Sequence, residues 1–257
     1  MATAIFTIAD DEQFVTRWCQ YHAQAFDAGY VLWHVPPDGG DKPLPDMGDS
    51  EFDLVPVYQR YTFDATWLVQ TVQAFQVFLL QSFGLVAFTS VDSFLVPRAG
   101  TLKRYLQALV ASRIWAIRAT GYEICHYQGR EPALDWQAPL LLPQRQYWVP
   151  AAQQSRPVMA KNPLYWTEGF TDAVNMPAIT DPGLLLLHTH RIDFDACLRR
   201  HRRLCACEWP ADPAFSAPYR ANRITDQEQL WRWLLSNPNN VSEYASLQYI
   251  PEEVKVF

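Results

Sequence analysis

Short apolar segments and amphipathic segments alternate along the first 110 residues of the chain. Residues 4–9, 30–35 and 54–58 are apolar runs rich in β-branched and aromatic residues, a pattern typical of strands. Between them, apolar side chains recur every three to four residues, which places them on one face of a helix. Two helices are predicted in this way. The apolar face of the first consists of Phe14, Trp18, Tyr21 and Ala25. The second spans residues 65–83, and its apolar face consists of Leu68, Val72, Phe75 and Leu79.

The next informative alternation begins at Phe88, where the sequence predicts the start of a fourth strand. Its apolar run ends in a turn that carries one carboxylate, Asp92, between hydroxyl side chains. Residues 100–109 predict a helix, and residues 115–125 predict a strand with a break at Gly121. The order strand, helix, strand, strand, helix, strand predicts an α/β protein with a mostly parallel sheet covered by helices on both faces.

The second half of the chain has a less regular pattern. Residues 129–182 are rich in proline and predict irregular structure. Residues 184–187 predict a strand that runs into the sequence His-Thr-His-Arg at 188–191. Residues 195–207 and 227–236 predict two late helices. In a parallel sheet of this kind, ligands bind beyond the carboxyl ends of the strands.

Composition narrows the classes of function. Of 257 residues, 49% are hydrophobic and ten are tryptophan, so a sizeable core is available, and some tryptophans are free to stack on sugar rings or bases. The formal charge of -6 argues against general affinity for nucleic acid, which needs a basic face. The basic run at residues 199–203, Arg-Arg-His-Arg-Arg, predicts a helix with a solvated charged face.

The five cysteines are scattered at positions 19, 125, 197, 205 and 207, unlike the dense disulfide framework of a small secreted domain. We therefore expect a reducing, cytoplasmic compartment. Cys205, Cys207 and His201 form at most half of a zinc motif. The first residues lack the basic and apolar segments of a signal peptide, and no run approaches the roughly 20 apolar residues that span a bilayer.

Asp92 is the first candidate for chemistry. A carboxylate at the carboxyl end of a central strand can bind a divalent cation, and the cation can neutralise a diphosphate. The alternative is an aspartate that caps its own turn.

His188, His190 and Arg191 form a second candidate set at another strand end. Because residues two apart point to the same side of a strand, both imidazoles can face one cation or phosphate, or one can lie in the core. The Arg191 guanidinium can bind a diphosphate through paired hydrogen bonds, or it can form a surface ion pair with Asp193 or Asp195.

These motifs, taken in order, resemble the bacterial glycosyltransferase family 2-like group, which has a GT-A fold. That group opens with a strand and an acidic helix start, and a long helix precedes a strand with Asp-Val-Asp-Glu-Phe, Leu-Val-Pro and Gly-Thr-Leu. Here residues 90–97 read Ser-Val-Asp-Ser-Phe-Leu-Val-Pro, and Gly-Thr-Leu follows at 100–102. The group's later tryptophan, Gly-Phe-His element and Leu-Leu-Leu-His-x-His-Arg strand end are similar to Trp166, residues 169–171 and residues 185–191.

The resemblance extends over residues 4–209 and implies transfer of a sugar from a nucleotide-diphosphate donor. Asp92 matches the second acid of the Asp-x-Asp motif, and Ser90 stands at the first, so both are expected at the diphosphate. Ser93 replaces the glutamate of the family pattern, and Thr171 replaces its histidine. The resemblance implies a cation site formed by Asp92, His188 and His190. The Asp-x-Asp motif of this site is degenerate, because the hydroxyl at its first position is a weaker ligand for Mn²⁺ or Mg²⁺ than a carboxylate.

Two further sets of acids are candidates for binding or catalysis. A transferase needs a general base near the acceptor hydroxyl, and Glu168 and Asp172, which flank the Gly-Phe element, are the candidates. Their alternative role is that of ordinary loop acids. Asp10, Asp11 and Glu12 follow the first strand, where this fold places the nucleotide base and ribose, or they act as charges at a helix start.

We expect a single GT-A-like domain over residues 1–257, with a nucleotide-binding half over residues 1–110 and an acceptor half over residues 111–257. The expected function is hexosyl transfer from a nucleotide-diphosphate sugar to a glycan, such as a surface polysaccharide, or to a small-molecule acceptor. One alternative is a non-catalytic GT-A-like binding domain. Another is a phosphate-binding hydrolase that uses His188 and His190 with a metal.

Overall fold

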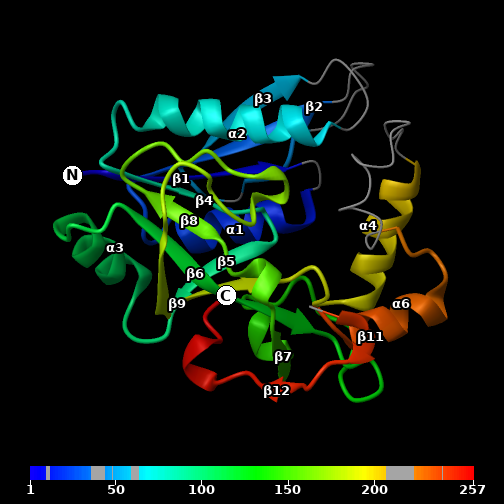
Figure 1. Ribbon diagram of the computed structural model, residues 1–257. Helices are drawn as coiled ribbons and strands as arrows, with labels where there is room; N and C mark the ends of the chain where they lie inside the picture. Colours follow the sequence, from blue (N-terminus) through cyan, green and yellow to red (C-terminus); the bar gives the residue numbers. More distant parts are fainter. Residues whose placement is uncertain (10–11, 36–43, 48, 59–63, 207–222, 239) are drawn as a thin grey trace.

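A ten-stranded sheet forms the centre of the molecule in a computed structural model of the chain (Figure 1). The residues that the structure describes are 1–9, 12–35, 44–47, 49–58, 64–206, 223–238 and 240–257. The strands of the sheet are β1 (Thr3–Ala9), β2 (Ala28–Val35), β3 (Asp53–Tyr58), β4 (Leu85–Phe88), β5 (Ser93–Pro97), β6 (Ala116–Cys125), β7 (Tyr147–Pro150), β8 (Pro157–Ala160), β9 (Ile179–His188) and β12 (Gln248–Tyr249).

The helices surround this sheet. The α-helices are α1 (Val15–His22), α2 (Ala65–Leu79), α3 (Leu102–Ala111), α4 (Phe194–Ala206) and α6 (Gln227–Leu234). The short 3₁₀ helices are η1 (Glu12–Phe14), η2 (Leu142–Gln144), η3 (Ala152–Gln154), η4 (Glu168–Phe170) and η6 (Glu252–Val254), and a separate hairpin pairs β10 (Ser236–Asn237) with β11 (Asn240–Tyr244). Within the described ranges, no helix combines the length and apolar character required to cross a bilayer.

The sheet is mixed, but most of its strands point the same way. The order is β3-β2-β1-β4-β8-β6-β7-β12, and β9 pairs with both β6 and β5. The first four strands are parallel to one another, and β6 and β9 are a parallel pair in the same direction. Strands β5, β7 and β8 run the opposite way. The predicted class, an α/β fold with a GT-A-like, mostly parallel sheet flanked by helices, is confirmed, and strands from both predicted halves of the chain share the sheet.

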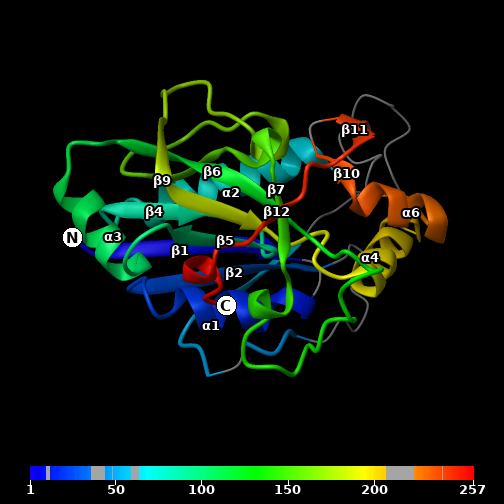
Figure 2. The same ribbon diagram turned by 90° about the horizontal axis from the view of Figure 1, so that it is seen from below.

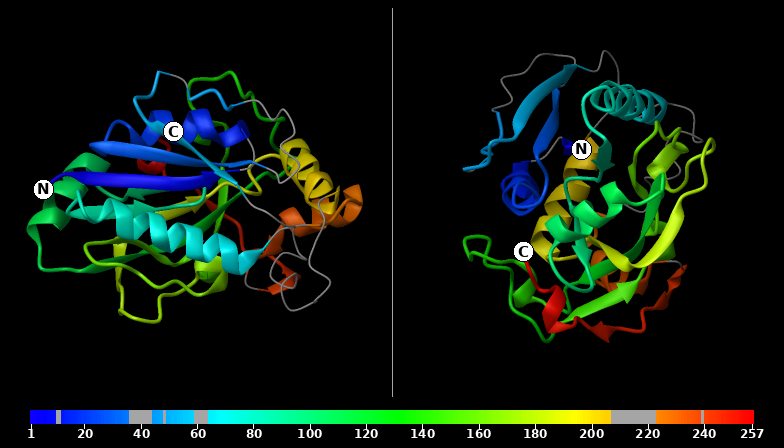
Figure 3. Two further views of the ribbon diagram at one scale, coloured as in Figure 1. Left: turned by 90° about the horizontal axis from the view of Figure 1, so that it is seen from above. Right: turned by 90° about the vertical axis from the view of Figure 1, so that its left-hand side faces the viewer.

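Alternating side chains on the first strands bury both faces of the sheet. Ile5 packs in the cluster with α1 and α3, whereas its neighbour Phe6 packs in the cluster with α2. Figure 2 shows the molecule from the side of β7 and β12, and Figure 3 shows α1 and α2 on opposite sides of the sheet. The buried indole of Trp18 in α1 donates its N–H to the Thr89 hydroxyl at 2.9 Å. This contact fixes the residues just after β4 against α1.

Several predicted boundaries are wrong, and each has a physical reason. Phe88 ends β4 instead of beginning a strand, because the chain turns back immediately and β5 pairs antiparallel with β9. The predicted break at Gly121 is absent, since β6 is continuous over Ala116–Cys125 and pairs with β9 at this position. The strands β7 and β8 lie inside the segment predicted to be irregular, where proline obscures their pattern. Most of the predicted loop after β2, residues 36–43 and 48, lies outside the described residues.

Gly121→Ala is expected to destabilise the protein by about 1–3 kcal/mol, because the glycine allows a close approach of η3 to β6. A Cβ atom at Gly121 would lie 2.4 Å from the backbone carbonyl carbon of Gln154. Gly129→Ala is the control, since its Cβ meets nothing nearer than 3.9 Å. Urea denaturation checks the prediction, and equal stability of the two variants contradicts it.

The helices α4 and α6 pack together at one end of the sheet (Figures 1 and 2). Strands β1 and β2 point toward this end, as the left panel of Figure 3 shows. Side chains of α4 therefore face the carboxyl ends of the parallel strands, where ligands bind in open α/β sheets.

Candidate functional site

Asp92 lies in the turn between β4 and β5, and this turn is fastened to the end of β9. Its backbone carbonyl accepts hydrogen bonds from the N–H and the hydroxyl of Thr189, both at 2.8 Å. The Asp92 Oδ2 atom is 3.4 Å from Nε2 of His188 and 4.0 Å from Nδ1 of His190. The structure therefore brings together the three residues that the sequence predicts as one cation site.

Two residues that sequence reasoning missed complete this group. Arg200 of α4 donates from Nη1 to Oδ2 of Asp92 at 2.7 Å. Glu123 of β6 lies on the other side, with Oε2 2.7 Å from Nδ1 of His188. We call Asp92, Glu123, His188, His190 and Arg200 the carboxylate–histidine cluster.

The protonation states of the cluster follow from burial and from neighbouring charges. Burial by itself would lower the pKa of His188, but the carboxylates of Glu123 and Asp92 raise it to about 9. Burial would raise the pKa of Asp92, yet His188 and Arg200 hold it well below its usual range. Burial, together with the charge of Arg200 and His188, lowers the pKa of His190, which is neutral at pH 7. The cluster thus pairs two carboxylates with two internal cations.

A third cation, Arg156, lies beside the degenerate acidic motif at residues 90–93. The guanidinium of Arg156 donates from Nη2 to the Ser90 hydroxyl at 2.7 Å and to the Ser93 hydroxyl at 3.2 Å. The two hydroxyls are themselves 2.8 Å apart. Serine at both positions is therefore suited to an arginine, whereas the family's acids are suited to a metal ion.

The donor atoms of Asp92, His188 and His190 lie within 4.8 Å of one another, which is close enough for one metal ion. The chemistry of these three side chains nevertheless argues against a bound Mg²⁺ or Mn²⁺. Mg²⁺ and Mn²⁺ prefer anionic oxygens, and the Asp92 carboxylate already pairs with Arg200. A protonated His188 has no lone pair to give. The residues present therefore do not fit a resident Mg²⁺ or Mn²⁺ in this arrangement.

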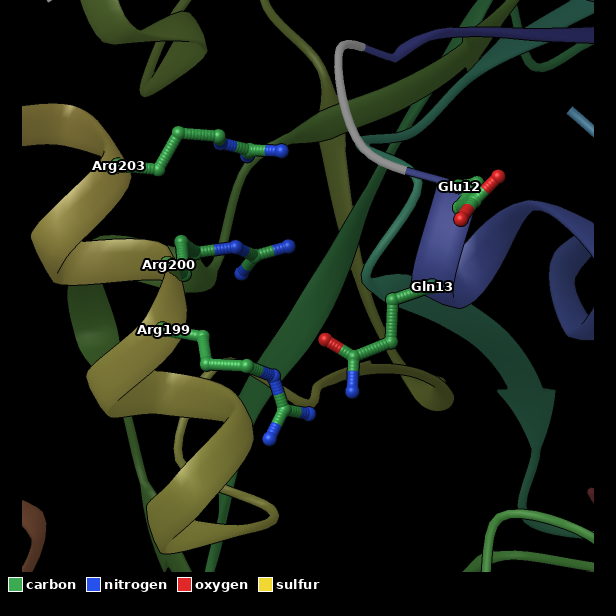
Figure 4. A pocket seen from close by; sticks show the side chains of 5 residues that line it. All are labelled: Glu12, Gln13, Arg199, Arg200 and Arg203. Carbon is green, nitrogen blue, oxygen red and sulfur yellow. The ribbon is translucent and has the colours of Figure 1, made fainter. Parts of the chain in front are cut away.

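A cavity of about 390 Å³ opens beside the cluster, between α4 and η1. Figure 4 shows three guanidinium groups of α4 directed across it toward η1. Since η1 follows β1 closely, the cavity lies beyond the carboxyl end of β1. The residues that line this arginine cavity are Glu12, Gln13, Arg199, Arg200 and Arg203.

The predicted helix at the basic run is confirmed, but the predicted solvated face is wrong for two of its members. Arg199 is exposed, whereas the Arg200 side chain is 12% exposed and His201 is fully buried. Arg199 and Arg203 are one helical turn apart, with Arg200 on the same side of α4. This i, i+1, i+4 spacing is the signal in the sequence from which the cavity wall could have been found.

Arg191 does not occupy the place expected for a diphosphate ligand. It is 3% exposed, donates from Nη1 to the Ser236 carbonyl at 2.7 Å and lies over the Trp233 ring at 4.0 Å. The alternative pair with Asp193 is wrong as well, because Asp193 contacts Arg145 at 3.4 Å. Arg191 thus ties the end of β9 to the segment that follows α6.

The predicted general bases lie away from the cluster, over the α2 side of the sheet. Glu168 accepts a hydrogen bond from the Thr66 hydroxyl at the start of α2 at 3.1 Å. Asp172 forms an ion pair with Arg118 of β6. Thr171, the position at which the family has histidine, is exposed beside them.

Asp10 and Asp11, predicted to contact the nucleotide, lie outside the described residues, as does Cys207 of the predicted half zinc motif. Glu12, the third acid of the first group, lies on the wall of the arginine cavity.

No curated protein and no protein-family model matches the sequence. Among solved structures, the S. aureus TarS fragment 1-349 is similar with a TM-score of 0.35 and 10% identity, over 91% of this chain and 79% of that one. A longer S. aureus TarS structure gives a TM-score of 0.36 and 12% identity, over 99% of this chain and 50% of that one. The fragment in complex with UDP-GlcNAc gives 0.33 and 10%, over 91% and 80%. TM-scores this low assign no family to the chain.

Proposed function

We propose that the protein is a nucleotide-sugar-dependent glycosyltransferase that holds the donor diphosphate with arginines of α4 in place of a metal ion. The observation that carries this proposal is the arginine cavity, which lies beyond the carboxyl end of β1 and next to the carboxylate–histidine cluster. Its volume of about 390 Å³ is within the ordinary range for small-molecule sites. The motif order that resembles the glycosyltransferase family 2-like group supports the same class of ligand.

Each wall of the cavity suits one part of a nucleotide sugar. Guanidinium groups bind phosphate oxygens through paired, charge-assisted hydrogen bonds, so Arg199 and Arg203 are assigned to the diphosphate. Arg200 is held by Asp92 and orients this face of α4. We assign Glu12, on the opposite wall, to the ribose, whose hydroxyls can donate hydrogen bonds to its carboxylate. UDP-GlcNAc is the first donor to test, because the TarS fragment binds it.

In the proposed reaction, the acceptor hydroxyl attacks the anomeric carbon of the donor sugar, and the bond from that carbon to the diphosphate oxygen breaks. The leaving diphosphate gains negative charge, which Arg199 and Arg203 stabilise. A base takes the proton of the acceptor. The candidates Glu168 and Asp172 lie on the α2 side of the sheet, away from the carboxylate–histidine cluster, so we assign the role to neither.

A panel of uridine, guanosine and thymidine diphosphate sugars tests the transferase activity, with release of the nucleoside diphosphate as the readout. The expected result is turnover of one donor at the same rate in EDTA and in Mn²⁺. Absence of binding and turnover across the panel contradicts the proposal.

A non-catalytic binding domain is the second candidate, favoured by Arg156 between Ser90 and Ser93. Ser90→Asp separates the two. We expect the new carboxylate to pair with Arg156, so that Mn²⁺ affinity does not appear and turnover is unchanged or reduced. Ser246→Asp, on an exposed segment, controls for the added charge. Calorimetric titration with Mn²⁺ is the measurement, and Mn²⁺-dependent nucleotide binding in the Ser90 variant alone favours a domain that has lost its metal.

A further inference from the structure

Helix α4 carries a second group of side chains on the side away from the arginine cavity. Cys197 and His201 are four residues apart, so they lie on one face of the helix, and both are buried. His190, from the turn after β9, reaches the same point. The Nε2 atoms of His190 and His201 are 3.0 Å apart, and Sγ of Cys197 is 3.6 Å from Nε2 of His201.

We propose that His190, Cys197 and His201 form a binding site for one Zn²⁺ ion, with a fourth position for water or another ligand. With Zn–N near 2.0–2.1 Å and Zn–S near 2.3 Å, tetrahedral geometry requires about 3.3 Å between two nitrogens and about 3.6 Å between nitrogen and sulfur. The two separations that involve His201 differ from these values by a few tenths of an ångström at most, and the donor atoms of all three residues lie within 4.8 Å of one another. Two imidazoles and a thiolate favour Zn²⁺ over Mg²⁺ or Mn²⁺.

Neighbouring groups fix the orientation of both imidazoles. Nδ1 of His201 is 3.1 Å from the Ile224 N–H and 3.2 Å from the Ile224 carbonyl, and the carbonyl is the acceptor when Nε2 binds the ion and Nδ1 carries the hydrogen. Nδ1 of His190 accepts a hydrogen bond from Nη1 of Arg200 at 3.2 Å, so Nε2 carries the hydrogen in the metal-free protein. Binding of the ion at Nε2 moves this hydrogen to Nδ1, breaks the contact with Arg200 and leaves Oδ2 of Asp92, 4.0 Å away, as the acceptor. The ring of Trp233 packs against both imidazoles, with centroid distances of 5.5 and 5.1 Å.

Binding of the ion replaces one proton. Burial raises the pKa of the Cys197 thiol to about 12, so the metal-free thiol keeps its hydrogen. Zn²⁺ forms a bond to sulfur, and the thiol proton is released to solvent. This site shares only His190 with the carboxylate–histidine cluster, and it stands independently of the proposed transferase activity.

Titration of the EDTA-treated protein with Co²⁺ tests the site. We expect one equivalent to bind, with a thiolate-to-cobalt charge-transfer band and the intense visible bands of a tetrahedral ion, and Zn²⁺ to displace it. Cys197→Ser should lose the charge-transfer band, and His201→Gln should weaken binding more than tenfold as measured by competition. Cys19→Ser is the matched control, because Cys19 is also a buried helical thiol whose pKa burial raises to about 12.

Circular dichroism shows whether each variant folds, and thermal melting gives a second readout. Zn²⁺ should raise the melting temperature of the wild type and of Cys19→Ser but not of His201→Gln. A folded wild type that binds neither metal, or identical spectra for the two cysteine variants, overturns the zinc site. Nucleotide binding in EDTA is scored separately, so failure of the zinc site is distinguishable from failure of the proposed function.

Discussion

Replacing Arg199 and Arg203 together with glutamine should weaken binding of the proposed nucleotide-diphosphate sugar donor by about 100-fold or more. A hydrogen bond to a charged group contributes about 1.5–3 kcal/mol, so the loss of two such contacts costs about 3–6 kcal/mol. A factor of ten in affinity corresponds to about 1.4 kcal/mol. Titration calorimetry at low salt, with the wild type as reference, measures the effect.

Arg202→Gln is the control for this prediction, because Arg202 belongs to the same basic run but is exposed and does not line the cavity. It should bind the nucleotide as the wild type does. Equal losses in the control and in the double variant would mean that net charge, and not the cavity, governs binding.

Arg200→Met should destabilise the fold by about 3–5 kcal/mol, since it removes the nearer of the two cations that pair with the buried Asp92 carboxylate and leaves only His188, at 3.4 Å. The Arg200 and Asp92 side chains are 12% and 9% exposed and their ion pair is 2.7 Å long. Asp92→Asn in the same chain should recover much of the loss, because a neutral amide needs no counter-charge. Urea denaturation of the two single variants and the double variant gives the coupling energy. If Arg200→Met lowers the free energy of unfolding by less than about 1 kcal/mol, the pair contributes no more than an ordinary surface ion pair, and the prediction is contradicted.

The parts of the fold that could be predicted are those in which the spacing of apolar residues along the sequence matches the residues that are buried in the structure. Ile5 and Phe6 pack on opposite faces of β1, and the heptad-like face of α2, with Val72 and Leu79, is buried as its spacing predicts. The strands β7 and β8 were not predictable in this way, because each is four residues long and ends or begins with proline.

The candidate site was predictable in part. Asp92, His188 and His190 converge because strand ends at one edge of a sheet meet, which the order of elements indicates. Glu123 and Arg156 were missed because their partners are distant in sequence: Glu123 lies 65 residues from His188, and Arg156 lies 66 from Ser90. Nothing in the local pattern around either residue marks it as part of a site. Arg200 differs from them, since helical spacing alone places it with Arg199 and Arg203.

The most direct measurement of the proposed donor binding is a thermal-shift titration of the wild type with UDP-GlcNAc and other nucleoside diphosphate sugars, in EDTA and in Mn²⁺. A ligand that binds the folded state raises the melting temperature, and the shift grows with the logarithm of the ligand concentration once that concentration exceeds the Kd. If arginines replace the metal, one donor should raise the melting temperature in EDTA, and Mn²⁺ should not increase the shift. A shift that appears only with Mn²⁺, or no shift with any donor, would contradict metal-independent binding in the arginine cavity.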